Sequence, residues 1–159
     1  MEPSDPLFQE RLNPIFASLG EAKEIVLSTS AKNRVTSRIV SCACNREEIL
    51  FLSWGHHTKC QQIKVNPLVA LCHKNLQIEG SAEMLGNPLD SAHKSHADTF
   101  RKIQPAIFDN FSKLPGMVLV RIAISAITAW TRDAQGYCID HFDLEKKKYR
   151  SVRPADEYG

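Results

Sequence analysis

The most informative absence in this sequence is that of a long apolar run. None of the 159 residues lies in a segment approaching the roughly 18 consecutive apolar residues that span a bilayer. The longest candidate, 117–130, is interrupted by Arg121, Ser125 and Thr128. The opening residues, Met1 to Asp5, also lack the basic and apolar regions of a secretory signal. We therefore expect a soluble protein of the cytoplasm.

A large net charge and a disulfide framework are missing as well. The charge is +2, with 20 Lys and Arg against 18 Asp and Glu, which is too small to indicate a nucleic-acid partner. The five cysteines are odd in number and irregular in spacing, as is typical of free thiols in a reducing compartment. Because repeats, low-complexity segments and linkers are also absent, we expect a single domain over residues 1–159.

What the sequence does contain is a series of short segments of strand character joined by turn residues. Strands are predicted over 25–30, 35–44, 49–53, 68–73, 76–85, 118–130 and 137–142. Most connections between them are too short for the crossovers of a parallel sheet. The predicted fold class is therefore mainly β, with about seven antiparallel strands in a closed or partly closed barrel and a few peripheral helices.

Helices are predicted at three places. Asp5, Pro6 and Gly20 suit the N-cap, first position and end of one helix, which Pro14 must kink or divide. A second helix is expected over 58–65, with Thr58 as its cap. An insertion of about 88–113 holds a helix to about residue 102 and another from 105 to 111, and the lysines 146–148 are expected to lie in a solvated tail.

Two short segments carry a pattern that predicts anion binding. Arg38 lies within a predicted strand next to the apolar Ile39 and Val40, where a guanidinium needs an anion or a carboxylate. Thr58 and Lys59 stand at a helix start, where free N–H groups favour anions. A phosphate that bridges Arg38, Lys59 and the Thr58 hydroxyl would satisfy all three groups. In the alternative interpretation, Arg38 pairs with a nearby Glu and Thr58 is only a helix cap.

Four segments in a fixed order carry a resemblance to a known family. They are Arg38-Ile39-Val40, Phe51-Leu52-Ser53-Trp54, Thr58-Lys59 with Ile63, Asn66 and Pro67, and Ile78-Glu79-Gly80-Ser81-Ala82-Glu83. In this order they resemble the pyridoxamine 5′-phosphate oxidase-like, FMN-binding split β-barrels. The resemblance implies a split barrel of about six to seven strands and a homodimer with FMN in the groove between subunits. It also implies a flavin-dependent oxidoreductase.

The same resemblance implies which residues meet the cofactor. Arg38 and Lys59 would hold the FMN phosphate, with the Thr58 hydroxyl and His57 beside it. The backbone of 51–53 would meet the edge of the flavin ring. The full set of implied cofactor-binding residues is Arg38, Ile39, Val40, Phe51, Leu52, Ser53, His57, Thr58, Lys59, Asn75 and Trp130.

Three of these residues have further implied roles. Val40 would lie beneath the flavin ring. Asn75 takes the place of a Gln that reaches across the dimer, and Trp130 falls near an aromatic residue that closes the flavin pocket.

Two departures from the oxidase itself predict a different substrate. Ala43 stands where the oxidase has a Lys, and the last predicted strand, with Cys138-Ile139-Asp140-His141, lacks the arginine that holds the vitamer phosphate.

Other functions remain open at this stage. A non-catalytic protein of the same fold could carry flavin, or could bind haem through an axial ligand such as His73 or His141. A deazaflavin would require a longer basic groove, of which the sequence shows little sign. In a purely structural role, Arg38 would be satisfied internally. We expect no metal site, because His56, His57 and Cys60 do not complete a zinc ligand pattern.

Overall fold

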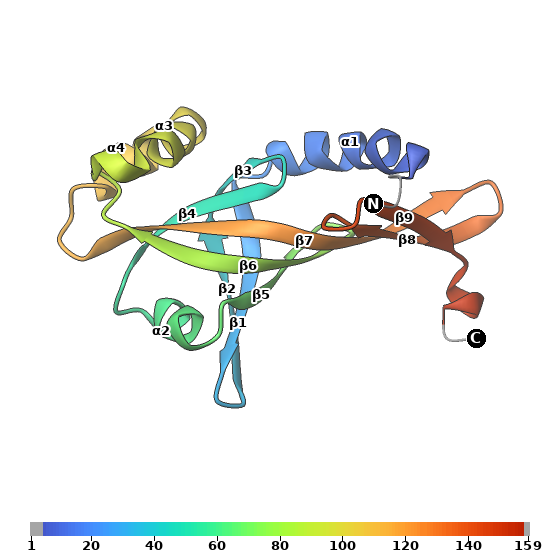
Figure 1. Cartoon of the computed structure of the whole chain (residues 1–159), viewed down its shortest axis with the longest axis horizontal. Helices are drawn as coiled ribbons and strands as arrows, with labels where there is room; N and C mark the ends of the chain where they lie inside the picture. Colours follow the sequence, from blue (N-terminus) through green and yellow to red (C-terminus); the bar gives the residue numbers. More distant parts are fainter. Residues whose placement is uncertain (1–4, 158–159) are drawn as a thin grey trace.

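The computed structural model describes residues 5–157 and shows a strongly curved antiparallel sheet with helices along its margins (Figure 1). Residues 1–4, where the sequence indicates no secretory signal, lie outside the described residues. The strands are β1 (Glu24–Ala31), β2 (Arg34–Ser41), β3 (Ala43–Asn45), β4 (Glu48–Trp54), β5 (Leu68–His73), β6 (Leu76–Gly86), β7 (Met117–Asp133), β8 (Gly136–Asp143) and β9 (Lys148–Val152). The helices are α1 (Pro6–Gly20), α2 (Thr58–Val65), α3 (Lys94–Ile103) and α4 (Pro105–Phe111), with short 3₁₀ turns η1 (Ser91–His93) and η2 (Pro154–Asp156).

The order of strands explains the curvature of the sheet. Neighbours follow the order β2-β1-β5-β6-β7-β4-β3, while β8 pairs with the far part of β7 and β9 pairs with β8. β2 and β3 stand at opposite ends of this order, yet only Cys42 separates them in the chain. The sheet must therefore curl until its two ends meet, and it stays open between β2 and β4. The prediction of a mainly β, antiparallel split barrel is confirmed.

Local signals in the sequence account for the first helix and the first hairpin. The Asp5 carboxylate accepts a hydrogen bond from the Leu7 N–H at 2.9 Å, as an N-cap does. The helix runs through Pro14 without a break, so of the two predicted effects of this residue, a kink or a division, the division does not occur. Lys32 and Asn33 both have positive φ, at 51° and 65°, which is the backbone twist that a two-residue hairpin needs.

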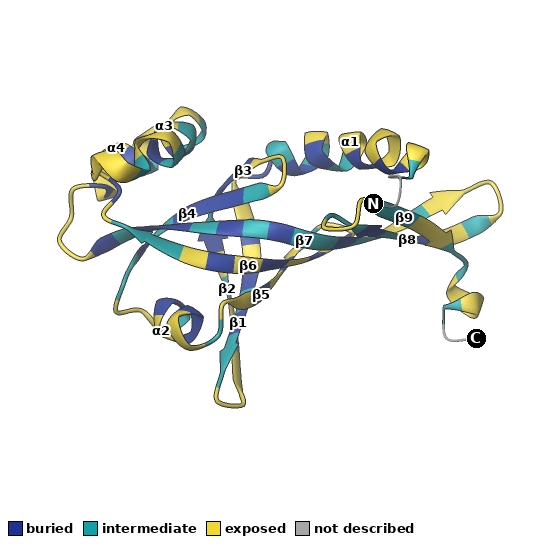
Figure 2. Ribbon diagram, viewed as in Figure 1, coloured by how far each residue is buried: buried dark blue, intermediate teal, exposed yellow. Residues whose placement is uncertain are grey.

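The hydrophobic core has two parts, on opposite faces of the sheet. The larger part fills the barrel, and along β6 the even-numbered residues 76–82 are buried while the odd-numbered ones are exposed, as the alternation predicts. The smaller part consists of Ala43, Leu50, Ala97, Phe100, Phe108 and Leu119. It joins the outer face of β4 and β7 to α3 and α4, so both faces of these strands are largely buried (Figure 2).

Gly80 permits the close approach of β6 to β7. The pairing register between these strands shifts at Gly80, and a Cβ there would lie 2.6 Å from the Ala123 carbonyl oxygen and 2.7 Å from Ile122 Cγ2. We expect Gly80→Ala to lower the free energy of unfolding by about 1–3 kcal/mol, because the backbone must move apart. Urea unfolding measures this change. Ser81→Ala, at the exposed neighbouring position, is the control, and equal stability of the two variants would contradict the prediction.

The C-terminal part differs from the sequence-based prediction. Nine strands form instead of six or seven, because the predicted 35–44 strand breaks at Cys42 and because β9 was not foreseen. The lysines 146–148 do not form a tail: Lys147 has φ 54° in the β8–β9 turn, and Lys148 begins β9. The ring of Tyr149 then packs against Phe142 of β8, with ring centroids 5.1 Å apart.

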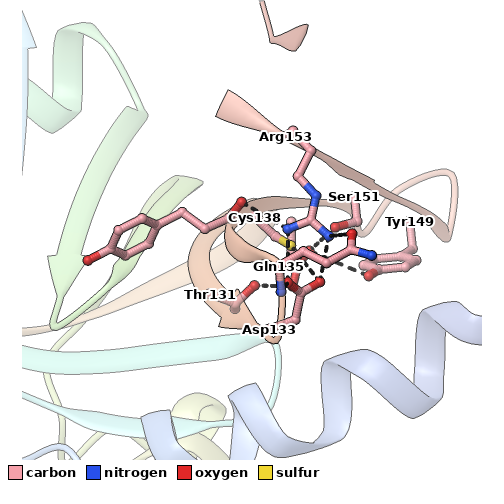
Figure 3. A network of polar contacts seen from close by, with 9 residues as sticks. Thr131, Asp133, Gln135, Cys138, Tyr149, Ser151 and Arg153 are labelled. Carbon is pink, nitrogen blue, oxygen red and sulfur yellow. Dashed lines mark hydrogen bonds and ion pairs between the residues drawn. The ribbon is translucent and has the colours of Figure 1, made fainter. Parts of the chain in front are cut away.

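A polar network fastens β9 and its continuation to the β7–β8 hairpin (Figure 3). The Arg153 guanidinium donates to both Asp133 oxygens at 2.9 and 2.7 Å, and it also donates to the Gln135 side chain. These bonds hold the pKa of Asp133 well below its usual range. Nearby, the Ser151 hydroxyl donates to Asp140 at 2.6 Å.

Within residues 5–157, no helix has the length and apolar character that crossing a membrane requires.

Candidate functional site

The opening of the barrel leaves two backbone edges facing each other. β3 pairs only with residues 48–50 of β4, whereas β7 covers the opposite edge of the whole strand. β2 pairs with β1 on one edge only. Among the described residues, the remaining edge of 51–54 and the free edge of β2 therefore have no strand partner. Their peptide N–H and C=O groups are available to a ligand.

A cavity of about 230 Å³ lies at this opening. We call it the β2–β4 cavity. It is lined by Ile39, Val40, Ser41, Leu52, Ser53, Trp54, His57, Lys59, Ile107, Phe111 and Met117. Its walls thus come from β2, β4, the start of α2, α4 and the first residue of β7. None of the lining residues is acidic, so the cavity combines an apolar wall with a cationic end.

Trp54 forms the centre of the apolar wall. Its ring centroid lies 5.4 Å from that of His57 and 6.0 Å from that of Phe111, which meets it edge to face at 87°. His57 belongs to the start of α2 and Phe111 to the end of α4. The contacts therefore join the helical insertion to the opening of the barrel, and they present flat aromatic surface to the cavity.

Lys59 forms the cationic end, with the ring of His57 beside it. The Lys59 Nζ lies 3.4 Å from His57 Nδ1. Burial lowers the pKa of His57, and the charge of Lys59 lowers it further. Burial also lowers the pKa of Lys59, with a smaller contribution from Arg38 in the same direction. Lys59 and Arg38 are thus close enough to repel each other.

Arg38 lies behind Lys59, on the face of β2 that carries Thr36. Its guanidinium donates to the Leu27 carbonyl at 3.1 Å, to the Thr29 hydroxyl at 2.8 Å and to the Thr36 hydroxyl. Burial lowers the pKa of Arg38. Within residues 5–157 neither Arg38 nor Lys59 has an ion pair with a carboxylate, so the alternative in which a Glu satisfies Arg38 is wrong for the part of the chain that is described.

Two other predicted site residues have different positions from those expected. Thr58 is the first residue of α2, and the N-cap is His57, which makes no side-chain capping bond, so the prediction that Thr58 caps the helix is wrong. The Thr58 side chain lines a separate hollow on the other side of the helix start. Phe51 is fully buried in the barrel core, which leaves only its backbone at the free edge of β4.

Asn75 and Trp130 lie together, away from the β2–β4 cavity. The Asn75 side-chain amide donates to the Trp130 carbonyl at 2.7 Å, and the Trp130 N–H donates to the Asn75 carbonyl at 3.2 Å. Met117 lines the cavity at the start of β7, and Trp130 is 13 residues further along the same strand, up to about 43 Å at 3.3 Å per residue. Within one chain, these two residues therefore do not join the other predicted site residues.

The structure adds five side chains that sequence reasoning missed: Ser41, Trp54, Ile107, Phe111 and Met117. Trp54 directly follows the 51–53 segment, and that position could have indicated it. Ile107 and Phe111 had no local signal, because they reach the cavity only through the packing of the insertion against β4 and β7.

Among the described residues, no group of three or more His, Cys, Asp or Glu side chains could hold a metal ion.

The Cys42–Cys44 pair and the two histidines considered as haem ligands lie outside the cavity. The Cys42 and Cys44 sulfurs are 3.8 Å apart within the barrel core. The hydrogen bond with Cys42 and burial raise the pKa of Cys44, so it remains a thiol. His141, one of the two residues considered as a haem ligand, lies on β8 with its Nε2 2.9 Å from the Glu157 carboxylate. His73, the other, borders a separate shallow hollow.

This open antiparallel barrel, with a cavity between its free edges, is a split β-barrel. No protein-family model matches the chain, and no curated protein matches it in sequence. A solved pyridoxamine 5′-phosphate oxidase-related, FMN-binding protein from Nostoc punctiforme is similar with a TM-score of 0.60 and 13% identity, over 94% of this chain and 98% of that one. The chain has the fold of the pyridoxamine 5′-phosphate oxidase-like, FMN-binding proteins.

Other solved structures of this fold have different ligands in their names. HutZ, the haem storage protein of Vibrio cholerae, is similar with a TM-score of 0.59 and 18% identity, over 71% of this chain and 89% of HutZ. PhzG of Burkholderia lata, in complex with tetrahydrophenazine-1-carboxylic acid, has a TM-score of 0.57 and 15% identity, over 94% of this chain and 92% of PhzG. At these identities the likeness concerns the fold, and function has to be argued from the site.

Proposed function

We propose that this chain binds FMN in the β2–β4 cavity and acts as a flavin-dependent oxidoreductase. The observation that carries the proposal is the pair of neighbouring cations, Arg38 and Lys59, which have no carboxylate partner among the described residues. Two part-buried cations that repel each other are stabilised when a dianion arrives between them. Phosphate is such a dianion, and the free N–H groups at the start of α2 add to its binding.

The remaining lining suits the rest of a flavin. The free edge of 51–54 offers peptide donors and acceptors to the rim of a ring system. Val40 and Trp54 offer apolar surface that excludes water from its faces. A bound flavin supplies hydride or electron transfer, so the chain itself need only position and shield it. The absence of the two basic residues of pyridoxamine phosphate oxidase, noted in the sequence, favours a different substrate.

The cavity by itself is small for this ligand, which supports a homodimer. Its volume of about 230 Å³ is below the roughly 300 Å³ at which ligand pockets usually begin. The outer face of β2, β1 and β5 next to it exposes a row of apolar side chains. These are Val26, Val35, Ile39 and Leu68, with relative exposures of 37%, 72%, 64% and 66%. Ile39 belongs both to this face and to the cavity, so a second copy seated here would complete the site.

We expect Ile39→Lys to convert a dimer into a monomer and to weaken FMN binding in the same variant. A lysine at the centre of the apolar face would leave a charge without a partner in the interface. Light scattering coupled to size-exclusion chromatography measures the mass of the particle. Leu89→Lys, an equally drastic change at an exposed residue far from this face, is the control. A wild-type monomer, or an Ile39→Lys dimer, would contradict the proposal of this interface.

The absorption spectrum of the purified protein tests the cofactor directly. Flavin bands, or tight uptake of added FMN by a colourless protein, are expected under the proposal. A Soret band with no flavin uptake would instead support the haem-binding alternative. Neither residue considered as a haem ligand, His73 or His141, lines the β2–β4 cavity, and this arrangement favours flavin. A protein that takes up neither group would refute the proposed function.

A further inference from the structure

A second hollow lies on the other side of the start of α2. We call it the α2 hollow. Its volume is about 480 Å³, roughly twice that of the β2–β4 cavity. It is lined by Ala31, Lys32, Arg34, His56, Thr58, Gln61, Gln62 and Val65. Among the lining residues none is acidic, and within residues 5–157 no ion pair engages Lys32, Arg34 or His56. The α2 hollow is therefore a basic groove, which the sequence did not predict.

The start of α2 lies between the two sites, and its successive side chains line one site and the other in alternation. His57 and Lys59 line the β2–β4 cavity, whereas His56 and Thr58 line the α2 hollow. A ligand held at the cationic end of the cavity therefore lies beside the hollow. The first N–H groups of this helix have no partner within the helix and add to anion binding at its start.

The inner face of β2 runs from one site to the other, and Thr36 and Arg38 in its middle line neither of them. Arg34, Thr36, Arg38 and Val40 alternate along the strand onto this face, and Arg34 lines the hollow while Val40 lines the cavity. At about 3.3 Å per residue, Arg34 and Arg38 stand about 13 Å apart along the strand, and two arginine side chains can converge across that span. One face of β2 therefore carries two guanidinium groups, those of Arg34 and Arg38, with the Thr36 hydroxyl between them.

The Gln62 side chain of α2 bonds to β2 between Arg34 and Arg38. Gln62 is only 6% exposed, and its Oε1 accepts from the Thr36 hydroxyl at 2.6 Å while its Nε2 donates to the Arg34 carbonyl at 3.1 Å. These bonds hold α2 against β2, so the path between the sites is rigid before a ligand arrives. A rigid arrangement with cations at both ends that have no carboxylate partner within residues 5–157 matches a ligand that carries two linked phosphates.

From this arrangement we propose that the site accepts a flavin dinucleotide, with the second phosphate bound by Arg34 and Lys32 in the α2 hollow. The inference rests on the proposed function, because the flavin and its first phosphate occupy the β2–β4 cavity. It goes beyond that function because it assigns a ligand to a second site. Ala31 and Val65 add apolar surface beside the cations, where the nucleoside of the ligand would lie.

Binding of FAD and FMN to the ligand-free full chain, followed by flavin fluorescence, tests the inference. The wild-type protein should bind FAD at least tenfold more tightly than FMN, as one added charge-assisted contact provides. Arg34→Gln and Lys32→Gln should each bring the FAD-to-FMN affinity ratio toward one. Lys146→Gln removes an exposed charge from the distant β8–β9 turn and should leave the ratio unchanged.

The outcomes separate the two proposals. Equal affinities for FMN and FAD in the wild type, or a ratio unaffected by Arg34→Gln, would overturn the second site while FMN binding stands. Binding of neither flavin would overturn the proposed function, and the second site with it. Lys59→Gln tests the two proposals separately. It should weaken the binding of FMN and of FAD by similar factors and leave the FAD-to-FMN affinity ratio near the wild-type value.

Discussion

Replacing Lys59 by alanine should weaken FMN binding by about tenfold to a hundredfold. The ammonium would make a charge-assisted bond to the phosphate, and such bonds contribute about 1.5–3 kcal/mol. Lys59 has no carboxylate partner among the described residues, so its removal breaks no ion pair of the folded chain. Isothermal titration measures the affinity. Lys64→Ala is the matched control, since Lys64 is exposed near the other end of the same helix.

Arg38 should behave differently, because it also bonds to its own chain. Arg38→Ala leaves the Thr29 and Thr36 hydroxyls without their common donor, so it should lower both the affinity and the stability. Arg38→Lys keeps the charge but loses the fork that reaches both hydroxyls, so we expect an intermediate affinity. If affinity for FMN stays within twofold of the wild type in both Lys59→Ala and Arg38→Ala, the phosphate assignment is wrong.

Phe100→Ala should lower the free energy of unfolding by about 3–5 kcal/mol, which is the range for removing a fully buried aromatic ring. Phe100 is 0% exposed and belongs to the core that joins α3 and α4 to the outer face of β4 and β7. Its ring centroid is 6.5 Å from that of Phe108 in α4. Loss of this ring should therefore loosen α4, which supplies Ile107 and Phe111 to the β2–β4 cavity.

Chemical denaturation followed by tryptophan fluorescence measures the effect of Phe100→Ala. Trp54, which contacts Phe111, reports on the position of α4 at the same time. Phe100→Leu should recover most of the lost stability, because it refills most of the volume. A stability loss below about 1 kcal/mol would mean that the insertion packs only weakly on the sheet, and its part in the cavity would then be in doubt.

Local signals in the sequence predicted several elements to the residue. Thr58–Val65, Leu68–His73 and Pro105–Phe111 have the bounds expected from their proline, asparagine and turn residues. β9 could not be predicted in this way. Its residues, Lys148–Val152, show no alternation of apolar and polar side chains, and the strand forms because β8 offers a free edge and Arg153 bonds to Asp133.

The candidate site was predictable to the extent that its parts are short motifs. Residues 39–40, 52–53 and 57 with 59 line one cavity, because the opening of the barrel brings β2, β4 and the start of α2 together. The direction of the Thr58 side chain depends on the phase of α2, which a sequence pattern fixes only within a residue or two. The contribution of the insertion depends on the Phe100 core and thus on contacts distant in sequence.

Arg38 and Lys59 have no carboxylate partner in the described part of the chain, and this has a consequence for the ligand-free protein. Their mutual repulsion raises the energy of the native state, and any anion that settles between them relieves it. Native stability then varies with the composition of the buffer: an anion present at a hundred times its dissociation constant adds about 2.7 kcal/mol. Phosphate and chloride solutions should give different melting temperatures for one and the same protein, and the difference should shrink once Lys59 is replaced.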